Sequence, residues 1–301
     1  MKLIKMMLMT FTLLFLLAAC SSEKIVPTEL PTDPTISISE PTETQSPETQ
    51  PRETHAATEP TKSIEPTEPT IPPLGESAGS RFECYYSDEY DDFLNYYVHI
   101  PEDAVVNMPL IVYLHGDGEV DRPYALPERG LKNFAVKIYG DAYPFIILEP
   151  NTRVKSWIKG CIPELLIGLI DRVAERYSIN VDKIILTGHS RGAIGVWNMI
   201  STYPEYFSAA VPVSSPHGKG HIDYVKAAGV PVWTFAGTVG ETERGYHKYL
   251  EQNVDQISVC GGFGKFTVLK GYEHSETRGA AYVEETFEWM LSQVNGVIPE
   301  E

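Results

Sequence analysis

The sequence is short of cysteine and of positive charge. Its 301 residues include only 4 Cys, and 24 Lys and Arg stand against 41 Asp and Glu, which gives a net charge of −17. A chain this acidic lacks the basic surface that nucleic acids require, and an anionic membrane surface would repel it. No two of the cysteines after residue 20 have the spacing of metal ligands, so we expect no zinc site.

A membrane-spanning run is also lacking. The apolar stretch 6–17 is too short for a comfortable transmembrane helix. It follows two lysines and precedes Ala18-Ala19-Cys20, which is the order of a secretory signal. Residues 17–20 resemble a bacterial lipobox, which implies that residues 1–19 are removed and that Cys20 carries a lipid. We therefore expect export and a lipid anchor at the outer face of a bacterial cell membrane.

Residues 20–80 have too few apolar side chains to form a core. These 61 positions hold 11 Pro, 11 Thr and 11 Asp or Glu, many of them in Glu-Pro-Thr repeats. Frequent proline removes amide donors and favours an extended chain, and the acidic groups repel one another. The composition predicts a disordered stalk between the lipid and the remaining chain.

Residues 81–297 are predicted to form one α/β domain. Apolar, β-rich runs alternate with amphipathic runs, which predicts a mostly parallel sheet with helices on both faces. Strands are expected at 95–100, 109–115, 145–149, 183–187, 209–213, 231–236 and 266–269, and helices at 164–177, 193–203, 243–253 and 277–293. No insertion is long enough for a cap domain. Cys84, Cys161 and Cys260 are odd in number, so at most one disulfide forms within the domain.

A candidate nucleophile lies between a predicted strand and a predicted helix. Residues 188–192 read Gly-His-Ser-Arg-Gly, the Gly-x-Ser-x-Gly pattern, and the strand–turn–helix context is that of a nucleophile elbow at Ser190. The glycines allow the close backbone approach that such a turn needs. The Gly-rich stretch after an earlier strand, at Gly116 and Asp117, can present backbone amides that form an oxyanion hole with the amide of Arg191.

A serine hydroxyl needs a neighbouring imidazole to become a good nucleophile. In the chain order Ser, acid, His, the histidine follows the last strand, and His274 alone fits that place. His115 and His189 are assigned to the two turns just described. His217 follows the strand 209–213 at the same sheet edge, where it is expected to contact substrate.

At this point the chain resembles the α/β-hydrolase family, in particular small secreted carboxylesterases and depolymerase-like esterases. The resemblance covers residues 93–293 and rests on the motifs around His115, Ser190 and His274, together with 203–211 and 230–237. It implies an α/β-hydrolase fold without a large cap, and a serine esterase that works through an acyl-enzyme without metal or organic cofactor.

The triad acid departs from the family pattern. Relatives carry an Asp where this chain has Gly240. Glu241 is the preferred replacement because its longer side chain can reach back from the next position. Glu243 in the same loop and Asp223 after the preceding strand are the alternatives.

These observations predict a cell-surface esterase for a bulky or polymeric ester, such as an acetylated or feruloylated polysaccharide. The rival prediction is a catalytically inactive hydrolase fold that serves as a surface binding module. Gly240 motivates the rival, and the retained Ser190, His274 and Gly-rich loop count against it.

Overall fold

A computed structural model of the protein describes residues 74–216 and 222–299. The strands are β1 (Gly79–Ser87), β2 (Asp92–Ile100), β3 (Leu110–Leu114), β4 (Ile146–Asn151), β5 (Ile184–His189), β6 (Ala209–Val213), β7 (Val232–Val239) and β8 (Gly264–Glu273). The helices are α1 (Leu126–Arg129), α2 (Lys132–Tyr139), α3 (Ile162–Arg176), α4 (Arg191–Thr202), α5 (Tyr224–Ala227), α6 (Tyr246–Val259), α7 (Thr277–Ala281) and α8 (Glu284–Ser292). Four short 3-10 turns accompany them.

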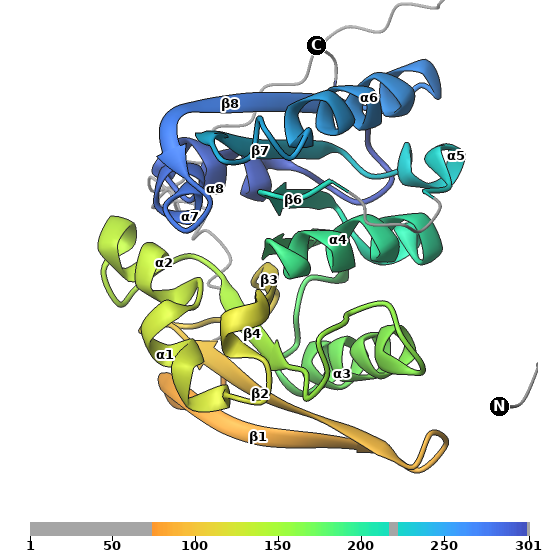
Figure 1. The fold of residues 1–301 in the computed structure, drawn as a ribbon. Helices are drawn as coiled ribbons and strands as arrows, with labels where there is room; N and C mark the ends of the chain where they lie inside the picture. Colours follow the sequence, from red (N-terminus) through yellow and green to blue (C-terminus); the bar gives the residue numbers. More distant parts are fainter. Residues whose placement is uncertain (1–73, 217–221, 300–301) are drawn as a thin grey trace, which may run out of the picture. The chain divides into compact units, whose positions relative to one another are not determined.

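The eight strands form one sheet in the order β1-β2-β4-β3-β5-β6-β7-β8 (Figure 1). β2 runs antiparallel to both β1 and β4. From β4 to β8 every neighbouring pair is parallel. The carboxyl ends of β3 and β5 to β8 therefore lie at one edge of the sheet, which is where open α/β sheets bind ligands.

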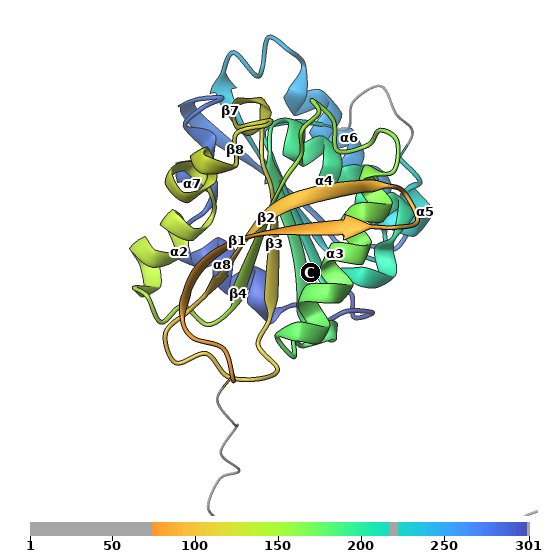
Figure 2. The same ribbon diagram turned by 90° about the horizontal axis from the view of Figure 1, so that it is seen from below.

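Helices cover both faces of the sheet, so the central strands are buried on both sides. Figure 2 shows α3, α4, α5 and α6 on one face and α2, α7 and α8 on the other. All five residues of β3 are buried, and successive side chains enter opposite cores. Leu110, Val112 and Leu114 join the core under α3 and α4, and Ile111 and Tyr113 join the core under α2 and α8. This explains why β3 reads as an unbroken apolar run.

The predicted α/β architecture is confirmed, with two corrections. One strand, β1, and three helices, α1, α2 and α5, were not predicted. The single closing helix expected at 277–293 is two helices, α7 and α8, separated at Tyr282. Tyr282 leaves helical geometry (φ −90°, ψ 73°) and is buried, with its hydroxyl 2.9 Å from that of Thr187.

The described structure begins before the predicted domain boundary at residue 81. Leu74 donates its N–H to the carbonyl of Ala104 at 2.8 Å, and β1 begins at Gly79. Cys84, Cys161 and Cys260 are all free thiols. Across residues 74–216 and 222–299, no helix combines the length and the apolar character needed to cross a bilayer. The predicted leader, Cys20 and the stalk up to residue 73 lie outside the described residues.

Candidate active site

Ser190 lies on the sharp turn between β5 and α4. Its backbone has φ 57° and ψ −115°, a conformation that costs a non-glycine residue energy. A Cβ at Gly188 would lie 2.8 Å from the carbonyl oxygen of Leu114, and one at Gly192 would overlap that same oxygen. Ser190 donates its N–H to Val213 at 2.9 Å, which fixes the turn against β6. The predicted elbow geometry is therefore present, and both glycines are required by close backbone contacts.

The structure brings Ser190, His274 and Glu241 together in one hydrogen-bonded chain. The Nε2 atom of His274 lies 2.8 Å from Ser190 Oγ, and its Nδ1 atom lies 2.5 Å from Glu241 Oε1. Since the carboxylate can only accept, Nδ1 carries the hydrogen and Nε2 is left to accept from the serine hydroxyl. This tautomer is the one that a general base for Ser190 requires.

Glu241 is the carboxylate that contacts His274, and its side chain is fully buried. Gly240 is in the left-handed region at φ 75°, where glycine is favoured, and the turn returns the next side chain toward the sheet. The second oxygen, Oε2, accepts the N–H of Gly237 at 2.6 Å. Both carboxylate oxygens are thereby satisfied, and the carboxylate is held in one orientation.

The two alternative acids lie elsewhere. Asp223 accepts a backbone N–H at 3.2 Å and acts as the N-cap of α5. Glu243 is exposed on the turn that precedes α6. Neither forms a hydrogen bond or ion pair with His274 within the described part of the chain.

Two backbone segments that carry the predicted oxyanion-hole amides lie beside Ser190. Arg191 is the first residue of α4, and no described group accepts its N–H. Gly116 lies beside Ser190, since a Cβ built on it would be 3.5 Å from the Cβ of Ser190. The carbonyl of Gly116 accepts the Nδ1–H of His115 at 2.7 Å. In a trans peptide the N–H points away from the carbonyl, so the N–H of Asp117 is turned away from that ring.

His115 is a neutral, buried anchor of this loop. Burial lowers the pKa of His115 to about 4. With Nδ1 donating to Gly116, Nε2 accepts the N–H of Thr152 at 3.2 Å and an amide hydrogen of Asn151 at 3.3 Å. The ring therefore ties the Gly-rich loop to the end of β4. The sequence placed His115 only in the turn and did not predict its anchoring role. Its position directly before the Gly-rich loop is the one feature of the sequence that points to this role.

His189 performs a similar task for His274. Burial lowers the pKa of His189 to about 3, so its ring is neutral. Its Nε2–H donates to the backbone carbonyl of His274 at 2.8 Å, and the hydroxyl of Thr277 donates to the same carbonyl at 2.9 Å. The residue just before Ser190 in the Gly-x-Ser-x-Gly motif thus positions the loop that carries the imidazole.

Arg191 pairs with Asp117 across the turn. Its Nε and Nη2 atoms donate to the two oxygens of the Asp117 carboxylate, with Nη2 at 2.7 Å. This hydrogen bond raises the pKa of Arg191 and lowers that of Asp117. The pair joins the Gly-rich loop to the N-terminus of α4, so two segments that supply backbone amides are fixed together.

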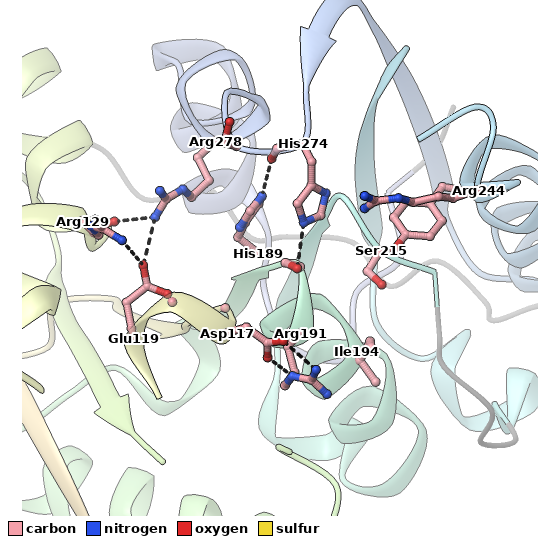
Figure 3. Close-up of a pocket in the computed structure, with 15 residues that line it drawn as sticks. Asp117, Glu119, Arg129, His189, Arg191, Ile194, Ser215, Arg244, His274 and Arg278 are labelled. Atoms are coloured by element: carbon pink, nitrogen blue, oxygen red, sulfur yellow. Dashed lines mark hydrogen bonds and ion pairs between the residues drawn. The ribbon is translucent and has the colours of Figure 1, made fainter. Parts of the chain in front are cut away.

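A cavity of about 510 Å³ has Ser190 among its lining residues, and Figure 3 shows the pocket. The loops after β3, β5, β6, β7 and β8 all contribute to its walls, as expected at the carboxyl edge of the sheet. Other side chains also line the cavity, outside the Ser190–His274–Glu241 chain and the Gly-rich loop. They include Arg129, Ile194, Ser215, Arg244, Tyr246 and Arg278. His217, predicted to contact substrate, lies outside the described residues.

No family model matches this sequence. A curated relative, poly(3-hydroxyalkanoate) depolymerase C of Paucimonas lemoignei, is 23% identical over 135 residues, which are 40% of this chain and 31% of the depolymerase. The chain thus spans about a third of that relative.

Solved structures share the fold at low sequence identity. A thermostable esterase superposes with a TM-score of 0.62 at 24% identity, over 72% of this chain and 63% of that one. The feruloyl esterase module from Clostridium thermocellum superposes with a TM-score of 0.55 at 14% identity, over 76% of this chain and 93% of that one. A poly(3-hydroxybutyrate) depolymerase from Bordetella parapertussis superposes with a TM-score of 0.53 at 14% identity, over 74% of this chain and 92% of that one. The strand order, the serine turn after β5 and these likenesses show that the chain has the α/β-hydrolase fold.

Proposed function

We propose that the protein is a serine hydrolase that cleaves carboxylic esters. The observation that carries the proposal is the unbroken hydrogen-bonded chain from Ser190 through His274 to the buried Glu241. A nucleophile, a base and a group that orients the base are all present at hydrogen-bond distance. The esterases and depolymerases among the structural relatives support the choice of esters as the substrate class.

The reaction follows from the placement of these groups. Ser190 Oγ attacks the ester carbonyl while His274 Nε2 takes the hydroxyl proton, and the tetrahedral oxyanion accepts hydrogen bonds from the backbone N–H groups of Arg191 and Asp117. Collapse of the intermediate expels the alcohol, which takes the proton from His274 and leaves an acyl-serine. A water molecule, deprotonated by the same imidazole, then releases the carboxylic acid and restores Ser190.

The negative charge of Glu241 stabilises the imidazolium formed in both halves of this cycle. Its burial strengthens that interaction, because little solvent screens the pair. The rival prediction of an inactive binding module began from Gly240. Glu241, one residue later, is hydrogen-bonded to His274, and this contact supports the enzyme over the binding module.

The substrate proposed from the sequence is a bulky or polymeric ester, such as an acetyl or feruloyl ester of a polysaccharide. The feruloyl esterase and depolymerase among the relatives support it. The resemblance of residues 17–20 to a lipobox and the predicted stalk add the proposal that the enzyme is anchored at the outer face of the cell membrane. That location suits a polymer that cannot enter the cell.

Covalent labelling tests the proposed function. A fluorophosphonate probe should label the protein, and peptide mapping should place the adduct on Ser190. Ser190→Ala should stay unlabelled. A protein that is folded and yet resists the probe would support the binding module instead.

A further inference from the structure

The cavity that Ser190 lines is positive in a protein that is strongly negative. Four arginines and two acids line it, Arg129, Arg191, Arg244 and Arg278 against Asp117 and Glu119, whereas the whole chain carries −17. His189 adds no charge because burial lowers its pKa to about 3. A positive lining that runs against the net charge favours an anionic ligand.

Three of these arginines are held by the two acids. Arg191 donates twice to Asp117. Glu119 lies 4.0 Å from Arg129 and 3.8 Å from Arg278, and Figure 3 shows this trio on the far side of His189 from Arg244. The positive charges of Arg129, Arg191 and Arg278 are therefore paired with carboxylates of the Gly-rich loop.

Arg244 is different, because no described carboxylate lies within ion-pair distance of its guanidinium. It sits on the turn between β7 and α6, three residues after Glu241. Two backbone hydrogen bonds fix this turn, from Gly245 to Thr242 at 2.9 Å and from Tyr246 to Glu241 at 3.0 Å. The backbone that carries Arg244 is therefore anchored to the residue that orients His274.

The position of Arg244 indicates which part of a substrate it would meet. Figure 3 shows its guanidinium directed toward His274. The ring of Tyr246, from the same turn, stands edge-on to His274 at 6.4 Å between centroids. His274 returns its proton to the leaving alcohol, so the alcohol part of the ester must lie on the His274 side of the cavity.

We propose that Arg244 and the adjoining cavity wall form a subsite for a carboxylate on the alcohol part of the ester. Two parallel N–H groups of a guanidinium match the two oxygens of a carboxylate, and the cavity offers no competing free acid at this wall among the described residues. The substrate class is then an acyl ester of an alcohol that itself bears a carboxylate, as hydroxy acids and acidic sugars do. This inference rests on the proposed function and narrows its substrate.

A matched pair of esters tests the subsite. The acetyl esters of meta-hydroxybenzoate and meta-hydroxybenzamide differ by one negative charge at nearly constant size. The measured quantity is the ratio of their kcat/KM values, corrected for their rates of hydrolysis by hydroxide. The full-length protein should prefer the carboxylate by about tenfold, the lower end for a charge-assisted hydrogen-bonded pair that is open to solvent.

The variants identify the residue responsible. Arg244→Gln should bring the ratio close to one, and Arg244→Lys should keep part of it, since charge remains while the paired donors are lost. Arg172→Gln, an exposed arginine of α3 outside the cavity lining, removes the same charge and should leave the ratio unchanged. Added salt should lower the ratio in the unaltered protein.

Three results would overturn the inference. The first is equal use of both esters by the unaltered protein, and the second is a preference that Arg244→Gln retains. The third is hydrolysis of neither ester together with no fluorophosphonate label on Ser190, which would remove the proposed function and the subsite with it. Hydrolysis without charge preference would remove the subsite alone.

Discussion

At the scale of single residues, the proposed triad acid Glu241 lies one position after Gly240, where the resembling family carries an Asp. Gly240 allows the turn and Glu241 supplies the carboxylate, so a longer side chain makes up for a one-residue shift. The sequence already favoured Glu241, but it left Glu243 and Asp223 open because side-chain reach depends on how a turn folds. The exposure of Glu243 and the capping role of Asp223 are properties of the assembled loops.

Glu241→Gln is expected to abolish most activity while the protein stays folded. The amide fills the same space, but it removes the negative charge and can leave His274 in the wrong tautomer. In serine proteases the equivalent change lowers kcat by about 10⁴, and we expect a loss of about 10²–10⁴ here, measured as kcat on p-nitrophenyl acetate. Glu243→Gln is the matched control and should keep its activity. Full kcat in Glu241→Gln would remove Glu241 from the triad.

At the scale of elements, strands buried on both faces were the most predictable. β3, β5 and β6 read as short apolar runs and lie within a residue or two of their predicted bounds. β1 was missed because it lies at the edge of the sheet and its side chains are largely exposed or half-buried. The break between α7 and α8 was missed because the buried Tyr282 fits the apolar pattern of one continuous helix. Its contacts with Thr187, Tyr113 and Phe134 come from distant parts of the chain, which a local pattern does not show.

The junction of β3, β5 and α4 leads to a prediction about stability. Gly192→Ala would place a methyl group on the carbonyl oxygen of Leu114, so α4 must shift away from β3. We expect a loss of about 3 kcal/mol in the free energy of unfolding, typical of severe overpacking. Gly279→Ala in α7 has open space around its Cβ and should change stability by no more than about 1 kcal/mol. Denaturant unfolding of both variants checks this, and equal stabilities would contradict it.

At the scale of the whole molecule, two buried neutral histidines make stability depend on pH. Burial lowers the pKa of His115 to about 4 and that of His189 to about 3, below the unfolded value of about 6.5. The unfolded chain therefore takes up protons first as the pH falls. The stability that these residues contribute is complete above about pH 6.5 and is lost as the pH falls toward 4.

Below pH 6.5, each of these histidines should lower the free energy of unfolding by up to about 1.4 kcal/mol per pH unit. Between about pH 7 and about pH 5, the free energy of unfolding measured with denaturant should thus fall by several kcal/mol. His115 and His189 together should account for on the order of 4 kcal/mol of this fall. His115→Gln removes one titrating group, so its drop should be smaller by about 2 kcal/mol over the same interval, whatever its stability at pH 7. An unchanged drop in that variant would show that His115 is protonated in the folded protein.

If Ser190 and His274 act as nucleophile and base of an ester hydrolase, hydrolysis of p-nitrophenyl acetate must depend on both side chains. The rate should be measured for the full-length protein beside Ser190→Ala and His274→Ala. We expect turnover by the unaltered protein and a loss of at least about 10³-fold in each variant, as for serine enzymes that lose a triad member. Hydrolysis by Ser190→Ala at the rate of the unaltered protein would contradict the role of Ser190 as nucleophile.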